Sequence, residues 1–391
     1  MEYQFSDRVK NLTGNAIREI FKLVSQPDVI SFAGGLPATE CLPADEIKQL
    51  SKECIEEDPV GVLQYGATEG YLPLRNTMLE FIKRSGIENQ KIDNTLIISG
   101  GQQGIDLFVK CFLNKGEVLL VQTPTYLAVL HISKTYEVKT VGVGTNDEGL
   151  DLIDLENKIK EYNPKAVYLV PNFSNPTGKT LSVETRKKAL EICEKYGVLI
   201  VEDDPYRELR YSGENLPSIK SFDKNGNVIY ICSMSKTIAP ALRVGVAVAP
   251  EEIIRKMTIG KQATDVHTNS LAQAIVSKYI LKGMVDPQLK KAIPIYREKR
   301  DAMLAAIEKY MPKTFKYTHP DGGLFIWGEF TDGTNAAEKF KEALAVKVAY
   351  VCGKDFFADG KGENCIRLNF SNATIEQIET GIKRLGAVFS K

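Results

Sequence analysis

The most reactive candidate in the sequence is Lys236, which follows an apolar run at 228–232 within Ser-Met-Ser-Lys-Thr. A lysine that is desolvated beside a buried strand has a lowered pKa and can form an imine with a carbonyl compound. Ser233, Ser235 and Arg243 can hold a phosphate dianion next to that amine. A surface Ser-x-Ser-Lys sequence is also common, so this segment alone leaves the chemistry open.

Three acidic residues, Glu202, Asp203 and Asp204, directly follow another apolar run at 198–201, and Tyr206 comes shortly after them. Carboxylates at the end of a buried strand need a cation, a metal ion or a protonated ring nitrogen nearby, because an uncompensated buried charge is costly. An exposed acidic loop explains the same residues equally well. The acids by themselves do not decide between a site and a loop.

A glycine-rich turn, Ser-Gly-Gly-Gln-Gln-Gly at 99–104, separates an apolar run at 96–98 from a helical pattern. A turn of small residues at a helix N-terminus presents free backbone N–H groups and the positive end of the helix dipole, and both attract phosphate. Gly101 and Gln102 would stand at that terminus. A plain strand-to-helix turn is at least as common an explanation.

An aromatic and an amide side chain follow two further apolar runs. Tyr126 comes after the run at 118–121, and Asn175 comes after the run at 166–170, in Asn-Pro-Thr-Gly. A tyrosine at a strand end can stack on a flat ring, although a lone tyrosine more often belongs to the core. Asn-Pro-x-Gly forms a good turn without any ligand. Neither segment requires a site by itself.

The strands that precede these segments must position them. Short apolar runs alternate with helical patterns from about residue 95 to 250, which predicts an α/β fold with a mostly parallel seven-stranded sheet sandwiched by helices. In open α/β sheets the ligand lies at the carboxyl ends of the strands. We therefore expect the candidate segments to meet at one edge. The runs are 96–98, 118–121, 138–143, 166–170, 198–201, 228–232 and 244–249.

The rest of the chain predicts a second, smaller domain. With 391 residues the chain is too long for one ordinary core. We predict an N-terminal lid segment at 1–45 that packs with the small domain, a large domain at 46–285 and a small α+β domain at 286–391. The elements expected in the small domain are a helix at about 296–310, strands at 324–330, 346–351 and 365–370, and a helix at 374–388.

Composition excludes several classes of protein. Lys plus Arg and Asp plus Glu both total 50, so no net field attracts nucleic acid or a membrane surface. The seven scattered cysteines indicate reduced thiols, and the three isolated histidines lack metal-ligand spacing. The sequence shows neither a secretion signal nor an apolar run of roughly 20 residues. We expect a cytoplasmic protein without a metal site.

Taken together, the segments match one ligand, pyridoxal phosphate, which has a flat ring, a phosphate, a phenolate and a ring nitrogen. Ser-Met-Ser-Lys-Thr with Leu-Arg-Val-Gly, Asn-Pro-Thr-Gly, Glu-Asp-Asp-Pro-Tyr and Cys-Ile-Arg-Leu-Asn-Phe-Ser resemble the class I aminotransferases of fold type I in order and spacing. The resemblance covers essentially the whole chain. It implies an enzyme that moves the amino group of an α-amino acid to a 2-oxo acid by a ping-pong mechanism.

The resemblance implies catalytic roles for Lys236, Asp203 and Tyr206. Lys236 would form a Schiff base with pyridoxal phosphate and shuttle the proton at the substrate Cα. Asp203 would pair with the ring nitrogen and keep the ring an electron sink. Tyr206 and Asn175 would bond the ring oxygen O3′, and Tyr126 would stack on the ring. The residues implied for the phosphate are Gly101, Gln102, Ser233, Ser235 and Arg243.

Two further residues are implied to complete the site. Arg367 would form a bidentate pair with the substrate α-carboxylate, with Asn175 beside it. Strand alternation puts Arg367 opposite the apolar face of its strand, and periodicity alone would let it face solvent. Tyr65 resembles a tyrosine that reaches the phosphate of the neighbouring subunit. A homodimer with shared active sites is therefore implied.

The segments 31–37 and 63–71 resemble one branch of the family, the 2-aminoadipate, kynurenine and aromatic aminotransferases. In that branch an arginine at the place of Arg18 contacts the far carboxylate of acidic substrates and swings out for aromatic ones. Gly35 would border the substrate and let the lid hinge. The implied donors are 2-aminoadipate and aromatic or large aliphatic amino acids, with 2-oxoglutarate as acceptor. The helical pattern at 16–24 alone predicts a solvated face for Arg18.

Two other functions fit the same residues. A C–S β-lyase uses this fold and cofactor, and it would release ammonia and pyruvate from cystathionine instead of accumulating a keto acid. A non-catalytic ligand-sensing module is the second alternative. The presence of Lys236, Asp203 and Arg367 argues against that module, and we expect no DNA-binding head on this chain.

Overall fold

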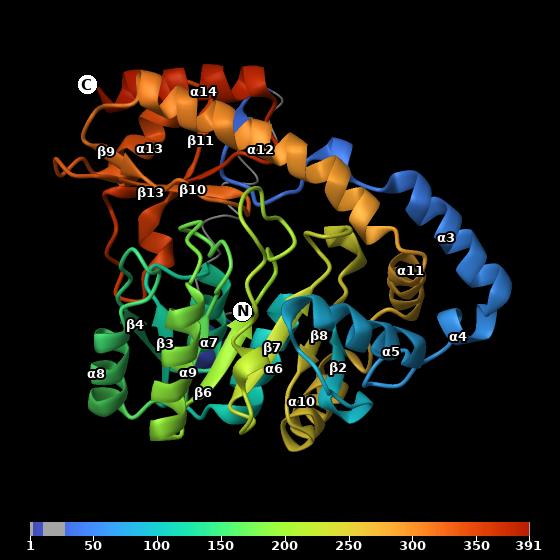
Figure 1. The fold of residues 1–391 in the computed structure, drawn as a ribbon. Helices are drawn as coiled ribbons and strands as arrows, with labels where there is room; N and C mark the ends of the chain where they lie inside the picture. The colour runs from blue at the N-terminus through green and yellow to red at the C-terminus, as the bar shows by residue number, and fades with distance from the viewer. Residues whose placement is uncertain (1–2, 11–27, 391) are drawn as a thin grey trace.

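The largest sheet of the structure contains the seven strands expected from the sequence. In the computed structural model, which describes residues 3–10 and 28–390, their order is β2-β8-β7-β6-β5-β3-β4 (Figure 1). β8 runs antiparallel to both of its neighbours, and the other pairs are parallel. The prediction of a mostly parallel sheet is confirmed. The strands are β2 (Thr95–Ile98), β3 (Val118–Gln122), β4 (Lys139–Val143), β5 (Ala166–Leu169), β6 (Leu199–Asp203), β7 (Val228–Ser233) and β8 (Gly245–Val248).

Helices cover both faces of this sheet, because successive residues of each buried strand point to opposite sides. On one side Leu120, Val167 and Ile200 pack with α8 (Leu152–Tyr162) and α9 (Val183–Tyr196). Helix α9 begins after Ser182, whose side chain accepts a hydrogen bond from a first-turn amide, and it ends at a left-handed glycine. The helices on the other side are α6 (Gly101–Phe112), α7 (Leu127–Thr135) and α10 (Glu251–Asp265).

The smaller part of the molecule holds a four-stranded antiparallel sheet of order β12-β13-β10-β9 (top of Figure 1). Its strands are β9 (Phe315–Tyr317), β10 (Phe325–Phe330), β12 (Val351–Cys352) and β13 (Cys365–Asn369), and its helices are α12 (Val285–Tyr310), α13 (Ala336–Ala345) and α14 (Ile375–Phe389). Strand β1 (Ile30–Ser31) pairs in parallel with β11 (Val348–Ala349), so it joins this part. The domain boundaries near 45 and 285 stay predictions.

Two elements differ from their predicted bounds. Helix α12 starts at Val285, whereas the sequence predicted a start near 296. The helix contains Pro294, which removes a helix hydrogen bond, so the sequence pattern did not reveal the turns before it. The strand predicted at 346–351 is two short strands. Its first half pairs with β1 and its second half pairs with β13, so the two halves belong to different sheets.

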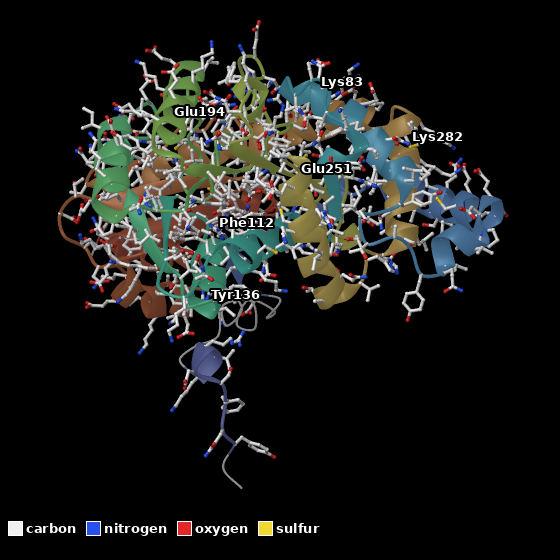
Figure 2. The ribbon with its side chains drawn as sticks, turned by 90° about the horizontal axis from the view of Figure 1, so that it is seen from below. Lys83, Phe112, Tyr136, Glu194, Glu251 and Lys282 are labelled. Atoms are coloured by element: carbon white, nitrogen blue, oxygen red, sulfur yellow. The ribbon has the colours of Figure 1, made fainter. Side chains whose placement is uncertain are left out.

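A group of helices extends from the flank of the large sheet. Figure 2 shows Lys282, directly after α11, on this flank, where its ammonium lies 2.6 Å from the Glu53 carboxylate of α3. The helices of the flank are α3 (Ala44–Glu57), α4 (Pro59–Leu63), α5 (Leu72–Phe81) and α11 (Ser270–Leu281). The short helix α1 (Asp7–Lys10) contacts α7. The amphipathic helix predicted at 16–24 lies outside the described residues.

Candidate active site

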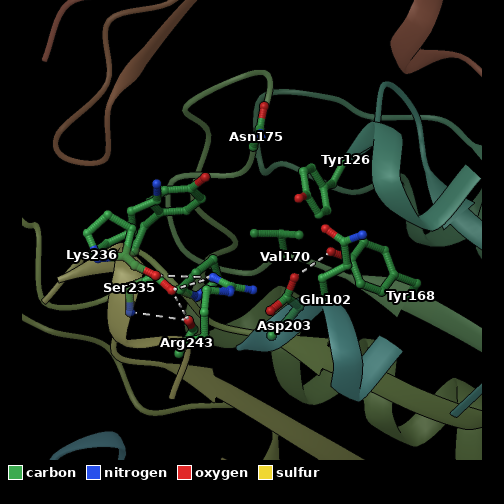
Figure 3. A pocket seen from close by; sticks show the side chains of 14 residues that line it. Gln102, Tyr126, Tyr168, Val170, Asn175, Asp203, Ser235, Lys236 and Arg243 are labelled. Carbon is green, nitrogen blue, oxygen red and sulfur yellow. Dashed lines mark hydrogen bonds between the residues drawn. The ribbon is translucent and has the colours of Figure 1, made fainter. Parts of the chain in front are cut away.

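A cavity of about 170 Å³ lies at the carboxyl ends of the central strands (Figure 3). It brings together every residue assigned to the cofactor except Tyr65. In Figure 3, Lys236, Ser235 and Arg243 stand on one side, and Asp203, Gln102 and Tyr126 on the other. The members of the predicted set that line it are Gly101, Gln102, Tyr126, Asn175, Asp203, Tyr206, Ser233, Ser235, Lys236 and Arg243.

Lys236 follows β7 closely and its side chain enters the cavity (Figure 3). Its Nζ donates a hydrogen bond of 2.5 Å to the carbonyl of Gly35. Burial lowers the pKa of Lys236 to about 8, and the positive charges of Arg367 and Arg243 contribute to the shift. An amine with this pKa is partly neutral near neutral pH, so it can act as a nucleophile and as a base.

Asp203 presents a carboxylate oxygen that lacks a partner. Its Oδ2 accepts a 2.6 Å hydrogen bond from the Tyr168 hydroxyl, whereas Oδ1 is buried without a hydrogen-bond partner among the described residues. Burial raises the pKa of Asp203 to about 7. A buried, unpaired carboxylate oxygen is costly unless a cationic group binds there. The arrangement therefore fits a protonated ring nitrogen.

The other two acids of the triplet are held away from the cavity. Glu202 accepts hydrogen bonds of 2.8 Å from the backbone amides of residues 219–220. Asp204 accepts one of 2.8 Å from the Asn172 side chain and one of 3.2 Å from the Tyr230 hydroxyl. Both carboxylates thus have partners within the protein. Of the three acids, Asp203 is the one that lines the cavity.

The end of the cavity at which the sequence predicts a phosphate site is formed by Arg243, Ser235 and the start of α6. The Arg243 guanidinium donates to Ser235 Oγ at 3.2 Å and to the Ser99 carbonyl at 3.1 Å. Gly100 precedes α6 with φ +84°, and a Cβ there would lie 2.3 Å from the guanidinium, so the position requires glycine. Among the described residues no side chain caps α6, and its first amides remain free for an anion.

Arg367 lies on β13 and is 2 % exposed. It donates to Asn175 Oδ1 at 2.8 Å and to the Ala33 carbonyl at 2.6 Å, and its Nε has no partner among the described residues. The guanidinium carbon lies 4.2 Å from the centre of the Phe325 ring and 5.0 Å from that of Phe356. Burial lowers the pKa of Arg367 to about 10. Neutral acceptors and aromatic rings leave its charge available to an incoming carboxylate.

Of the predicted residues that the structure describes, Tyr65 lies away from the cavity, whereas Arg367 and Gly35 contact residues that line it. Tyr65 is 83 % exposed and packs edge-on against His267, with ring centres 5.9 Å apart. Arg18 lies outside the described residues. Gly35, by contrast, lies at the site, because its carbonyl accepts the hydrogen bond from Lys236.

The sequence interpretation missed Tyr168 and the two rings beside Arg367. Tyr168 stands on β5 opposite Val201 of β6, which brings its hydroxyl to Asp203. Its position inside an apolar run was the available signal, because a tyrosine there needs a hydrogen-bond partner. Phe325 and Phe356 are far from Arg367 in sequence, and no sequence pattern identifies them as its neighbours.

Within residues 3–10 and 28–390, no cluster of three or more His, Cys, Asp or Glu residues is arranged to hold a metal ion. In the same ranges no helix combines the length and the apolar character that crossing a membrane requires.

Comparison with known proteins identifies the family. The model of the class I and II aminotransferases matches residues 27–385. The aromatic-amino-acid aminotransferase 1 of Thermococcus litoralis is 42 % identical over 98 % of this chain and 93 % of its own length. The 2-aminoadipate transaminase of Thermus thermophilus is 38 % identical over 98 % and 95 %. The crystal structure of kynurenine aminotransferase from Pyrococcus horikoshii superposes with a TM-score of 0.95 at 40 % identity, covering 99 % of this chain and 96 % of that one.

The residues of the cavity fit the cofactor of this family. Asp203 Oδ1, which has no partner among the described residues, suits the ring nitrogen, the uncapped start of α6 suits the phosphate, and the Lys236 amine enters the same cavity. A minority lyase reaction and a non-catalytic sensor were the alternatives left open by the residues, and the comparisons favour transamination. The chain belongs to the class I and II aminotransferases and is a pyridoxal-phosphate-dependent transaminase of amino acids and 2-oxo acids.

Proposed function

We propose that this transaminase takes the amino group of 2-aminoadipate or of aromatic and large aliphatic amino acids and transfers it to 2-oxoglutarate. The observation that carries the proposal is the buried Arg367, which contacts neutral acceptors only and stands ready for an α-carboxylate. Relatives named for aromatic amino acids, kynurenine and 2-aminoadipate support the breadth of donors.

We assign the cofactor contacts as follows. When bound, pyridoxal phosphate supplies the carbon that accepts the amino group and a ring that withdraws electrons. Asp203 binds the ring nitrogen through its free Oδ1, while Tyr126 lies against the ring. Tyr206 and Asn175 donate to the ring oxygen. The phosphate is held by Gly101, Gln102, Ser233, Ser235 and Arg243.

Lys236 acts as the acid and base of the reaction in this proposal. Its amine stands in the same cavity as Asn175 and close enough to Arg367 for the two charges to interact. Arg367 fixes the substrate carboxylate, which directs the Cα–H bond toward Nζ. The lowered pKa of Lys236 lets Nζ take the proton from Cα and return it without a large energetic mismatch.

A half-reaction screen tests the proposed donors. The loaded enzyme is mixed with each amino acid, and the change in cofactor absorbance is followed without any acceptor. We expect fast changes with 2-aminoadipate, glutamate, phenylalanine and leucine, and slow changes with small or cationic amino acids. Absence of a response to both acidic and aromatic donors would contradict the proposal.

Arg18 is predicted to bind the far carboxylate of acidic substrates. Replacing Arg18 with glutamine should raise KM for glutamate and 2-aminoadipate by roughly 10–100-fold, the scale of one charge-assisted hydrogen bond. KM for leucine and phenylalanine should stay nearly unchanged, because these substrates lack that carboxylate. The measurement is steady-state kinetics with both substrate classes.

Arg8 provides a matched control for this experiment, because it is an exposed arginine on the same N-terminal segment. Arg8→Gln should alter neither class of substrate. An equal rise in KM for acidic and aromatic substrates in Arg18→Gln would show that Arg18 does not discriminate between substrate side chains.

We further propose a homodimer in which Tyr65 contacts the cofactor phosphate of the partner subunit. Its exposure on a single chain supports this role. Tyr65→Phe should weaken cofactor retention by roughly tenfold, because it removes one hydrogen bond to a charged group. The measurement is the dissociation constant of pyridoxal phosphate, determined by titration of the cofactor-free chain.

Mixed dimers test the sharing of sites. A dimer of one Tyr65→Phe and one Lys236→Ala subunit contains one site with both residues intact, if Tyr65 serves the neighbouring site. At limiting cofactor, such mixtures should exceed the mean activity of the two parents. Activity equal to that mean would contradict a shared site.

We also propose a cytoplasmic location. All seven cysteines are free thiols, which is typical of reducing compartments. Fractionation of the cells that express the protein tests this location, and recovery from a membrane or extracellular fraction would contradict it.

A further inference from the structure

A network of charged and polar side chains, centred on the buried Lys261, lies behind the proposed phosphate site. Lys261 of α10 is 0 % exposed. Its Nζ lies 2.8 Å from both carboxylate oxygens of Asp265 and 2.8 Å from Gln103 Oε1. A buried ammonium is costly unless it is paired and fully hydrogen-bonded. These contacts satisfy Lys261 and join α10 to the first turn of α6.

The same network holds the turn that precedes α6. Gln103 Oε1 also accepts from the Ser99 amide at 2.7 Å, and Gln103 Nε2 donates to Asp265 Oδ2 at 2.7 Å. Ser99 Oγ donates to that carboxylate at 3.0 Å. On its opposite side, the Ser99 carbonyl accepts from Arg243. Ser99 is therefore held between the ion pair of α10 and the arginine assigned to the phosphate.

The turn after Asp265 allows a second residue, Thr268, to contact Ser99. Val266 has φ +63°, which is a strained backbone state for a β-branched residue. This turn brings Thr268 back toward α6, and Thr268 Oγ1 lies 3.0 Å from Ser99 Oγ. Asp265, which precedes Val266 in the chain, and Thr268, which follows it, thus both contact the Ser99 hydroxyl. Strain of this kind persists where the surrounding contacts determine the structure.

We propose that Lys261 and Asp265 are positioning residues for the phosphate-binding turn at 99–102. Asp265 contacts Ser99 of the turn directly, and Lys261 acts on the turn through Asp265 and Gln103. Neither residue is assigned to the phosphate, and together they fix the direction in which the amides of Gly101 and Gln102 point. A phosphate is bound by several directed N–H groups, so a small rotation of this turn weakens all of them together. The proposal rests on the phosphate site assigned under the proposed function.

The test compares pyridoxal phosphate with pyridoxal, which has the same ring and aldehyde but no phosphate. Dissociation constants are measured by absorbance titration of the full-length chain after removal of the cofactor. Lys261→Met should raise the dissociation constant of pyridoxal phosphate by roughly tenfold or more, the scale of a hydrogen bond to a charged group. The substitution should leave the dissociation constant of pyridoxal unchanged. A general loss of structure would weaken both ligands equally, and that result would overturn the proposal.

Two control variants separate the possible outcomes. Lys220 forms a buried ion pair with Asp223, in which its Nζ lies 2.8 Å from the carboxylate. Lys220→Met should change the affinity for neither pyridoxal phosphate nor pyridoxal. Arg243→Gln should lower affinity for pyridoxal phosphate alone, and failure of this result would contradict the phosphate site itself. If Arg243→Gln behaves as expected and Lys261→Met leaves both affinities intact, the positioning role is wrong. Should Lys261→Met not fold, Asp265→Asn supplies the same comparison.

Discussion

Replacement of Lys236 by alanine is expected to slow the half-reaction by roughly 10²–10⁴-fold or more, the range for loss of a positioned acid–base group. Among the described residues that line the cavity, Lys236 is the one with a side-chain amine. Its removal should also abolish the Schiff base that the family resemblance implies between Lys236 and the cofactor. The contacts proposed for the phosphate and the ring come from other residues, so the variant should keep its fold and still bind pyridoxal phosphate. Stopped-flow absorbance with glutamate or phenylalanine measures the rate, and thermal unfolding checks the fold.

An arginine variant distinguishes proton transfer from the mere presence of charge. Burial lowers the pKa of Lys236 to about 8, so its neutral form is accessible near neutral pH. Arginine keeps its proton throughout this range. Lys236→Arg should therefore be as slow as Lys236→Ala, although it retains the positive charge. A rate near that of the wild-type enzyme in either variant would assign the proton transfer to another group.

The fold was predictable from the sequence where burial leaves a strong pattern. Six strands of the large sheet are buried along nearly their whole length, so each appears as a continuous apolar run. The edge strand β4 is only partly buried, but all seven strands were located. The small part was predicted less well. Its strands at 348–352 are short and belong to two sheets, and α12 contains Pro294. Pairing between distant segments determines these elements, and local periodicity does not reveal such pairing.

The site was predictable to the extent that strand ends converge. Asp203 is the last residue of β6, Lys236 and Asn175 follow β7 and β5, and the topology brings the three to one cavity. The contacts of Tyr168 and Lys261 were not predictable, because each depends on which side chains meet across packed elements. The sequence also could not separate Asp203 from its two acidic neighbours. That distinction comes from the backbone amides and side chains that engage Glu202 and Asp204.

Asp203→Asn is expected to slow the half-reaction by roughly 10²–10³-fold, the effect of losing one preorganised electrostatic contact. Asparagine has nearly the same shape and can still accept the hydrogen bond from Tyr168. It lacks the negative charge that favours protonation of the ring nitrogen, so the ring withdraws electrons less well. The cofactor should remain bound through its phosphate. Single-turnover absorbance with a good donor measures the effect.

The same substitution should stabilise the cofactor-free protein against unfolding. Burial raises the pKa of Asp203 from 3.8 to about 7, so the folded chain binds this proton more tightly than the unfolded chain. The contribution of Asp203 to stability is therefore greatest below pH 3.8 and is lost as the pH rises through about 7. Asparagine carries no charge at any of these pH values. At pH 8 the cofactor-free variant should exceed the wild-type chain in stability by a few kcal/mol, on the order given by such a pKa shift.

Thermal unfolding at pH 5 and pH 8, with and without pyridoxal phosphate, separates these effects. The variant should gain stability at pH 8 without cofactor, and it should gain less than the wild-type chain when cofactor is added. Glu202 and Asp204 titrate in both proteins, so the difference between the two proteins reports Asp203. Asp204→Asn is the matched control, because Asp204 is buried but faces Asn172 and Tyr230. If Asp204→Asn slows the half-reaction more than Asp203→Asn does, the ring nitrogen is not bound by Asp203.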